Sequence, residues 1–112
     1  MKTTYTFHVH RNAGSSDRMA PSGIYVTEDC EPLAIRLYAE QAPLAPATFD
    51  VYDDGDSILS RYATLAAGQN GDELADNFIT STMIDAGSWL SCDMLDAGGG
   101  YNFTLQLDVE IL

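Results

Sequence analysis

Basic side chains are scarce in this sequence. Its 112 residues contain 17 Asp and Glu but only 5 Lys and Arg, so the formal net charge is −12. A chain with so few cations lacks the broad positive surface that binds nucleic-acid phosphates. It is also repelled by anionic membrane surfaces. We therefore expect neither nucleic acid nor a membrane among its partners.

Cysteines and long apolar runs are also few. Cys30 and Cys92 are the only two cysteines, and their wide separation matches neither a CxxC pair nor a zinc framework. Two buried thiols are the expected state, and a disulfide closing a long loop is the alternative. No stretch resembles a membrane span or a secretion signal, so we expect synthesis and folding in the cytosol of the producing cell.

Helical periodicity is the third scarce feature, because no segment sustains it for three turns. Residues 101–111 instead alternate polar with apolar side chains, and residues 4–10 and 33–38 do so over shorter lengths. This alternation predicts strands with one buried face. Residues 71–76 are the one stretch for which we predict a helical turn, inside a loop.

Turn signals separate the predicted strands. Asp54-Gly55 predicts a tight hairpin turn within residues 49–59, and we place the four prolines between strands. Further strands are predicted over residues 23–27, 62–66, 77–84 and 90–94. The pattern therefore predicts an all-β fold in which residues 1–112 form a single antiparallel β-sandwich of eight or nine strands. The expected topology is jelly-roll or immunoglobulin-like.

Alternation also assigns side chains to the two faces of each strand. Tyr5 and Tyr101 share inward parity with aliphatic residues, whereas Tyr38, Tyr52 and Trp89 have outward parity. The expected core consists of Phe7, Val9, Leu33, Ile35, Leu37, Phe49, Val51, Ile58, Leu65, Leu90, Cys92, Leu105, Leu107 and Val109.

No arrangement of residues indicates catalysis, and we predict no catalytic residue, no cofactor and no metal, hence a protein that is not an enzyme. His8 and His10 lie on one face of a strand and could chelate a metal together with a third ligand. Solvent-facing imidazoles explain them equally. Residues 53–56 offer carboxylates for calcium, but a hairpin turn accounts for the same residues.

The order of motifs over residues 33–109 resembles the β-sandwich modules of structural proteins in tailed bacteriophages, including head-decoration, head-fibre and tail-associated proteins. The matching motifs are the hairpin Asp54-Gly55-Asp56-Ser57-Ile58, the turn Leu65-Ala66-Ala67-Gly68, the corner Asp85-Ala86-Gly87-Ser88-Trp89-Leu90 and the closing strand Leu105-Gln106-Leu107. The resemblance implies a virion structural protein made in the host cytoplasm, with a capsid decoration (cement) protein as the first choice. It further implies a homo-oligomer, such as a trimer, whose partners are other virion proteins, the major capsid protein first.

Charge is distributed unevenly along the chain. The first 18 residues contain three basic side chains and one acidic one, whereas residues 62–112 contain eight acidic side chains and no basic one. We therefore expect residues 1–22 to form a partner-docking strand and loop. The candidate partner-binding residues are Lys2, Arg11, Arg18 and Trp89.

Two other functions remain open. One is a carbohydrate-binding or adhesion module of a virion tail or cell surface, with Trp89 or Tyr38 contacting the sugar. The other is a small metal-binding protein that uses His8 and His10.

Overall fold

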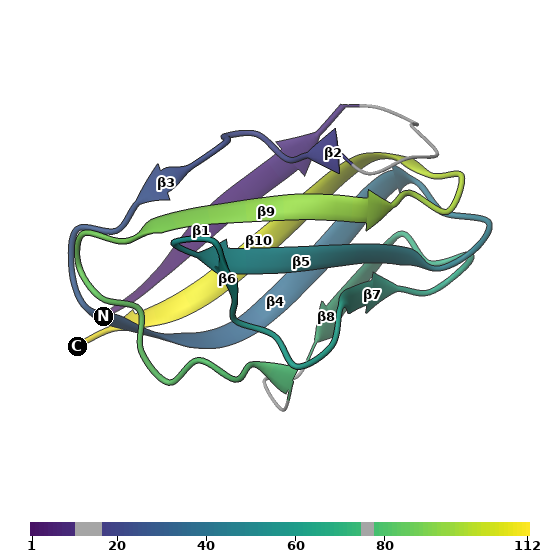
Figure 1. Ribbon diagram of the computed structural model, residues 1–112. Coiled ribbons are helices and arrows are strands. Elements are labelled where there is room, and N and C mark those ends of the chain that lie inside the picture. The colour runs from purple at the N-terminus through teal and green to yellow at the C-terminus, as the bar shows by residue number, and fades with distance from the viewer. Residues whose placement is uncertain (11–16, 75–77) are drawn as a thin grey trace.

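The computed structural model describes residues 1–10, 17–74 and 78–112, which form two antiparallel sheets packed face to face (Figure 1). Sheet A has the order β1-β10-β4-β8. Sheet B is built on β9 and β5, with β2 and β3 along β9 and β6 and β7 along β5. The strands are β1 (Lys2–Val9), β2 (Asp17–Arg18), β3 (Ile24–Tyr25), β4 (Cys30–Gln41), β5 (Ala47–Asp53), β6 (Asp56–Ser57), β7 (Ala63–Leu65), β8 (Gly71–Leu74), β9 (Trp89–Asp96) and β10 (Tyr101–Ile111). The predicted all-β antiparallel sandwich is confirmed, with ten strands in the described residues where eight or nine were predicted.

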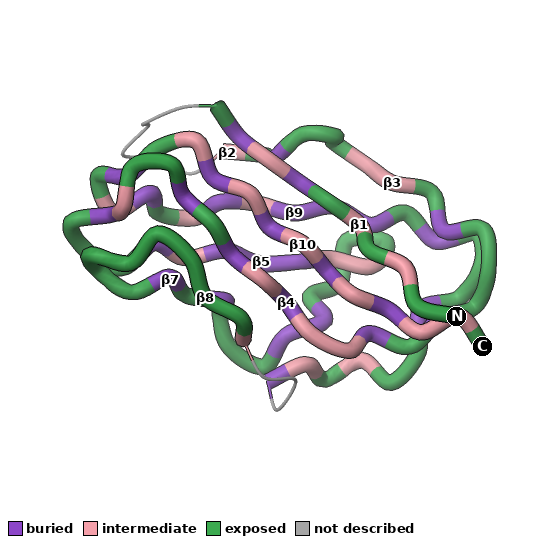
Figure 2. The backbone as a smooth tube through the Cα atoms, turned by 180° about the vertical axis from the view of Figure 1, so that it is seen from behind, coloured by how far each residue is buried: buried purple, intermediate pink, exposed green. Residues whose placement is uncertain are grey.

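Strand β10 shows why the alternation predicted the fold so well. It pairs with β1 on one side and β4 on the other, so its backbone is hydrogen-bonded along both edges. Its apolar side chains Phe103, Leu105, Leu107 and Val109 are buried, and the residues between them are only partly covered (Figure 2). Period-two burial is the expected result when one sheet face meets the core and the other meets water.

The core lies between the two sheets. The predicted core residues are all buried except Leu33. Phe49 of sheet B meets Phe103 of sheet A edge-on, with ring centroids 5.4 Å apart, so an aromatic contact joins the two layers. Irregular segments add further buried side chains that alternation could not identify, namely Met19, Val26, Phe78 and Ile84.

A register shift in β4 corrects two predictions. Val109 pairs with Pro32, whereas its neighbour Asp108 pairs with Ala34, so Leu33 is an extra residue with no partner on β10. The extra residue reverses the parity of the strand at this point. Pro32 is therefore buried and lies within the strand, not between strands, while Leu33 is only partly covered.

Three further predictions were wrong. Of residues 71–76, for which a helical turn was predicted, 71–74 form β8 because their backbone pairs with β4, although their side chains are largely exposed; 75 and 76 lie outside the described residues. No strand spans the described residues 78–84, where Ile79 and Ile84 make isolated bridges instead. Tyr101 lies at the open end of β10 and is 37% exposed.

Two other local predictions are confirmed. The hairpin between β5 and β6 turns at Asp54 and Gly55, whose φ angles of 50° and 88° match a tight hairpin turn. Cys30 and Cys92 are free thiols and both are buried. The described residues contain no helix of the length and apolar character that crossing a membrane requires.

Candidate functional site on the outward face of sheet A

The outward face of sheet A carries a continuous array of polar and aromatic side chains. The strand register places Tyr38 of β4 opposite Thr104 of β10, and Thr104 opposite His8 of β1. The next row contains Arg36, Gln106 and Thr6. Because neighbouring strands lie roughly 4.8 Å apart, the three side chains of each row span about 10 Å across the sheet.

Two adjoining depressions mark this face. One has a volume of about 450 Å³ and is lined by His8, His10, Tyr38, Glu40, Asn102, Phe103 and Thr104. The other, of about 260 Å³, is lined by Arg36, Leu37, Tyr38, Asp72, Glu73, Thr104 and Gln106. Tyr38 and Thr104 line both. Tyr38 is 53% exposed, so its ring stands between the two depressions and is available to a ligand.

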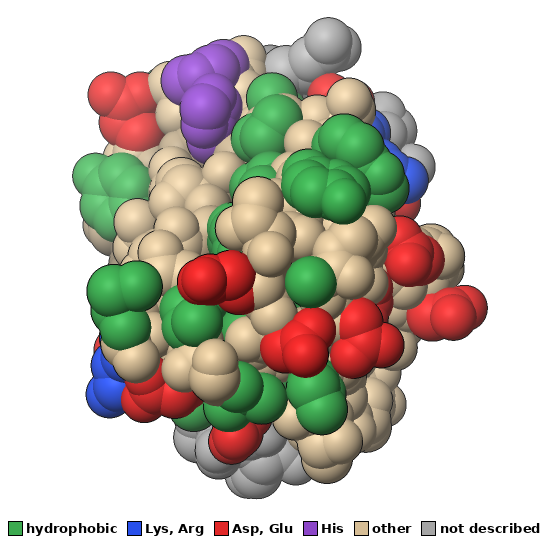
Figure 3. Space-filling model, turned by 90° about the vertical axis from the view of Figure 1, so that its left-hand side faces the viewer, with side chains coloured by type: hydrophobic (Ala, Val, Ile, Leu, Met, Phe, Trp, Pro, Cys, Tyr) green, Lys and Arg blue, Asp and Glu red, His purple; other side chains and the backbone are tan. Residues whose placement is uncertain are grey.

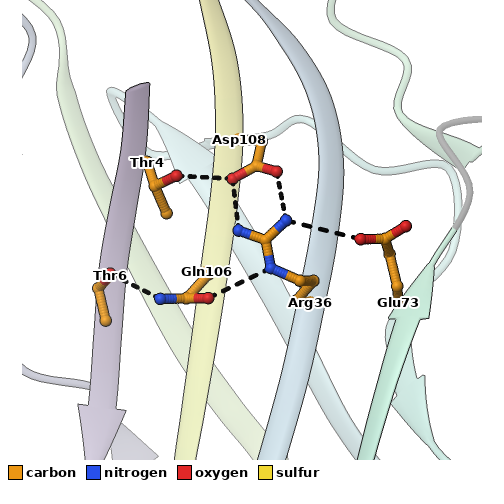
Figure 4. Close-up of polar contacts among 6 residues, drawn as sticks. All are labelled: Thr4, Thr6, Arg36, Glu73, Gln106 and Asp108. Carbon is orange, nitrogen blue, oxygen red and sulfur yellow. Dashed lines mark hydrogen bonds and ion pairs between the residues drawn. The ribbon is translucent and has the colours of Figure 1, made fainter. Parts of the chain in front are cut away.

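A hydrogen-bond network fixes the polar side chains of this face (Figure 4). The Arg36 guanidinium donates to both carboxylate oxygens of Asp108, one of them at 2.7 Å, and through Nε to Gln106 at 3.3 Å. Thr4 donates to Asp108 at 2.7 Å. Glu73 of β8 completes an ion pair with Arg36 at 3.6 Å. These contacts join all four strands of sheet A and hold the side chains in one arrangement.

The same network sets the charge state of its members. The hydrogen bonds from Arg36 hold the pKa of Asp108 below its ordinary value, and Thr4 adds to this effect. In turn, the hydrogen bond to Asp108 raises the pKa of Arg36. The outward face therefore carries a neutralised pair at its centre, together with the further carboxylates of Glu73 and Glu40.

The second group of polar side chains lies toward the end of β1. Asn102 donates to a carboxylate oxygen of Glu40. Asn102 has a φ of 57°, a conformation that Asn tolerates better than most residues. His8 and His10 lie with ring centroids 4.7 Å apart at an interplanar angle of 57°. These amide, carboxylate and imidazole groups give the larger depression both hydrogen-bond donors and acceptors.

The structure separates the predicted partner-binding residues. Lys2 is exposed on β1 of sheet A, and Arg11 lies outside the described residues. Arg18 lies on β2 of sheet B, where it forms an ion pair of 2.7 Å with Asp93 and stacks over Tyr52. Trp89 lies on β9 and is 54% exposed. The segment 1–22, predicted to dock a partner, includes β1, which pairs with β10 and contributes the buried Phe7 and Val9 to the core.

The two residues considered for sugar contact, Tyr38 and Trp89, lie on different sheets. They cannot stack on the same sugar ring. Sequence reasoning also missed Arg36, Asp108, Glu40 and Asn102 as members of one surface. Their outward parity was available as a signal, but alternation does not indicate which strands are neighbours.

Two sets of residues were considered as metal ligands, namely His8 with His10 and the aspartates of residues 53–56. Within residues 1–10, 17–74 and 78–112, no three His, Cys, Asp or Glu side chains are grouped so that they could hold a metal ion. His8 and His10 instead line the larger depression.

Comparison with known proteins gives structural neighbours but no sequence family. No protein-family model matches the chain, and no curated protein matches it. The structure is similar to Podospora anserina GH26-CBM35 β-(1,4)-mannanase, with a TM-score of 0.55 and 14% identity over 99% of this chain and 28% of that chain. It is similar to a family 35 carbohydrate-binding module from Clostridium thermocellum, with a TM-score of 0.51 and 12% identity over 99% and 92%.

A viral structure is also similar. The infectious bursal disease virus Gx strain structure has a TM-score of 0.50 and 14% identity, over 98% of this chain and 32% of that chain. At these identities the likeness concerns the fold alone. The β-sandwich is thus one that carbohydrate-binding modules and viral proteins share.

Proposed function

We propose that this protein is a non-catalytic carbohydrate-binding module whose sugar site is the outward face of sheet A. The observation that carries the proposal is the exposed ring of Tyr38 between two depressions lined by polar side chains. An aromatic ring packs against the C–H-rich face of a pyranose, while planar polar side chains pair with the sugar hydroxyls. The fold shared with a family 35 carbohydrate-binding module, over 92% of that module, supports the same function.

The rigidity of the face favours this function. Arg36, Asp108 and Gln106 are already held by one another, so little side-chain freedom is lost when a ligand is bound. Open depressions on a sheet suit an extended chain of sugar units better than a small enclosed metabolite. The extended glycan would run across Tyr38 from one depression into the other.

The charge of the face indicates the class of glycan. Glu40 and Glu73 add negative charge beside the Arg36–Asp108 pair, in which the positive charge is already matched. Uronic acids and sulfated sugars would be repelled by these carboxylates. We therefore expect neutral glycans to bind.

The test is calorimetric titration with xylohexaose, mannohexaose, cellohexaose and an oligogalacturonate. The unaltered protein should bind at least one neutral sugar and not the oligogalacturonate. Tyr38→Ala should raise the Kd about tenfold, a loss of about 1.4 kcal/mol, whereas Tyr38→Phe should retain most of the affinity. Tyr62→Ala is the matched control, because Tyr62 is 55% exposed but lies away from this face. Absence of binding to every neutral sugar, or equal binding by Tyr38→Ala, would contradict the proposal.

The second candidate is a virion structural protein, with a capsid decoration protein as the specific role. Its support is the motif resemblance over residues 33–109, together with the fold shared with the infectious bursal disease virus structure. In that role its partners are other virion proteins, the major capsid protein first, and the chain forms a homo-oligomer. Native mass spectrometry and the calorimetric titration together separate the two candidates. A virion structural protein should form an oligomer and show no affinity for sugars.

A further inference from the structure

Two exposed aromatic rings lie together on sheet B, away from the proposed sugar site. Tyr25 of β3 is the direct partner of Trp89 on β9, and their ring centroids are 5.1 Å apart in an edge-to-face arrangement. Tyr25 is 50% exposed and Trp89 is 54% exposed. We call this pair the aromatic platform. Exposed aromatic side chains of this size are typical of binding surfaces.

The structure around the platform holds both rings in place. A Cβ added at Gly23 would lie 3.3 Å from Cε3 of Trp89, so the indole rests close against this glycine. The Tyr25 hydroxyl similarly lies near Gly87. The Trp89 backbone N–H donates to the Asp54 carboxylate at 2.8 Å, and the Asp54 N–H donates to the Trp89 carbonyl at 2.9 Å. The rings therefore stay exposed without being free to collapse onto the surface.

Carboxylates surround the platform. Asp54 is hydrogen-bonded to Trp89, and Asp53 is paired with the next residue of β9, Leu90. Burial raises the pKa of Asp53, and the negative charges of Asp54, Asp85 and Asp56 raise it further. Figure 3 views this end of the molecule, where acidic and hydrophobic side chains gather and basic ones lie at the margins.

The described cations lie elsewhere. Lys2 lies on β1 of sheet A, opposite Glu110. Arg18 pairs with Asp93, Arg36 pairs with Asp108, and Arg61 stacks over Phe78. In the part of the chain that the structure describes, the carboxylates at positions 53, 54, 56 and 85 therefore have no Lys or Arg ion-pair partner. The surface combines π-electron-rich ring faces with unneutralised negative charge.

We propose that the aromatic platform docks a basic polypeptide segment, with an arginine or lysine side chain packed over Trp89 and Tyr25. A cation over an aromatic ring is attracted by the negative face of the ring, and the carboxylates add long-range attraction. The protein already uses this contact once on the same sheet, where the Arg18 guanidinium lies 5.8 Å from the ring centroid of Tyr52. A neutral sugar could use the rings but would gain nothing from the charge. The platform is on sheet B, so this interaction does not depend on the sugar site of sheet A.

Trp89 is the single tryptophan of the chain, so its fluorescence reports on the platform directly. The experiment titrates the protein with hexa-arginine at about physiological salt and uses a Gly-Ser hexapeptide as the neutral control. Hexa-arginine should change the Trp89 emission saturably, and the neutral peptide should not. Calorimetry on Tyr25→Leu and Trp89→Leu should show at least a fivefold rise in Kd. Thermal melts establish that each variant is folded. Tyr25→Phe keeps the aromatic ring and should bind hexa-arginine with the affinity of the unaltered protein.

Charge and position are tested separately. Asp56→Asn combined with Asp85→Asn should weaken hexa-arginine binding, whereas Asp72→Asn combined with Glu73→Gln, on sheet A, should leave it within twofold. Tyr38→Ala, which alters the proposed sugar site on sheet A, should also leave the affinity for hexa-arginine unchanged. The two proposals can therefore fail independently of each other. Equal binding by the leucine variants would mean attraction to net charge alone and would overturn the proposal. Quenching of Trp89 by a neutral hexasaccharide but not by hexa-arginine would overturn it in favour of a second sugar site.

Discussion

Arg36 on β4 and Asp108 on β10 form a bidentate ion pair that lies diagonally across the two central strands of sheet A. Arg36 is directly opposite Gln106, not Asp108, so the pair ties together two rows of the sheet. This contact fixes the polar surface on which Tyr38 stands. It also makes the stability of the fold depend on pH in a defined direction.

The Asp108→Asn variant should be less stable than the unaltered protein at pH 7, by about 1 kcal/mol for a partly exposed bidentate pair. The fold lowers the pKa of Asp108, so it favours the ionised form. The stabilisation is fully present above the pKa of about 3.9 of an unfolded Asp, and is lost as the pH falls through the lowered folded value. Urea unfolding at pH 7 and in more acidic buffers should show the difference shrinking. A difference that does not change with pH would contradict this explanation.

The Asp53→Asn variant should have the opposite effect. Burial raises the pKa of Asp53, so the fold disfavours its ionised form, and one carboxylate oxygen is buried without a hydrogen-bond partner. Above its folded pKa the charge destabilises the protein, and acidification restores the lost stability. Removing the charge should therefore raise the urea midpoint at pH 7, with little effect at a pH where Asp53 is protonated. A lower midpoint at pH 7 would be inconsistent with this cause.

The Leu107→Ala variant should lose roughly 2–5 kcal/mol of unfolding free energy, because Leu107 is completely buried in β10. Leu33→Ala should cost much less, because the register shift in β4 leaves Leu33 only partly covered. Chemical denaturation of the two variants measures the contrast. Similar losses at both positions would mean that Leu33 occupies the core after all.

The Gly98→Ala variant should be strongly destabilised. Gly98 has a φ of 59°, and a Cβ at this position would lie 2.0 Å from the carbonyl oxygen of Ala45. Gly68→Ala is the control, since Gly68 also has a positive φ, of 81°, but no atom lies within 4 Å of the added Cβ. The control should lose only the conformational cost, about 1–2 kcal/mol. Thermal melts that rank the two variants the other way would refute the close approach at Gly98.

The two thiols should resist modification in the folded protein. Cys30 and Cys92 are both buried, and burial raises the pKa of each, which suppresses the reactive thiolate. Ellman's reagent should therefore titrate two thiols in denaturant and react slowly without it. Rapid reaction of either thiol in the native protein would show that the buried environment opens readily.

Much of the fold followed from local pattern. Residues 101–111 alternate without interruption, and Asp54-Gly55 supplies the backbone angles of a hairpin turn, so β10 and the β5–β6 hairpin were predictable. Two of the wrong predictions share one cause. Leu33 and residues 71–74 were misassigned because a bulge and an edge pairing depend on the neighbouring strand, which no local pattern contains.

The amino-acid sequence determined by itself that this chain is an acidic β-sandwich. It also determined the inward face of the regular strands, apart from the bulge at Leu33 and the strand end at Tyr101. Hydrophobic alternation acts over a few residues, so it is visible in one dimension. Only the tertiary structure decided that Tyr38 stands beside the Arg36–Asp108 pair on one sheet and that Trp89 meets Tyr25 on the other. Those neighbours are set by strand order and register, which arise from pairing between residues as much as 108 positions apart, as between Lys2 and Glu110.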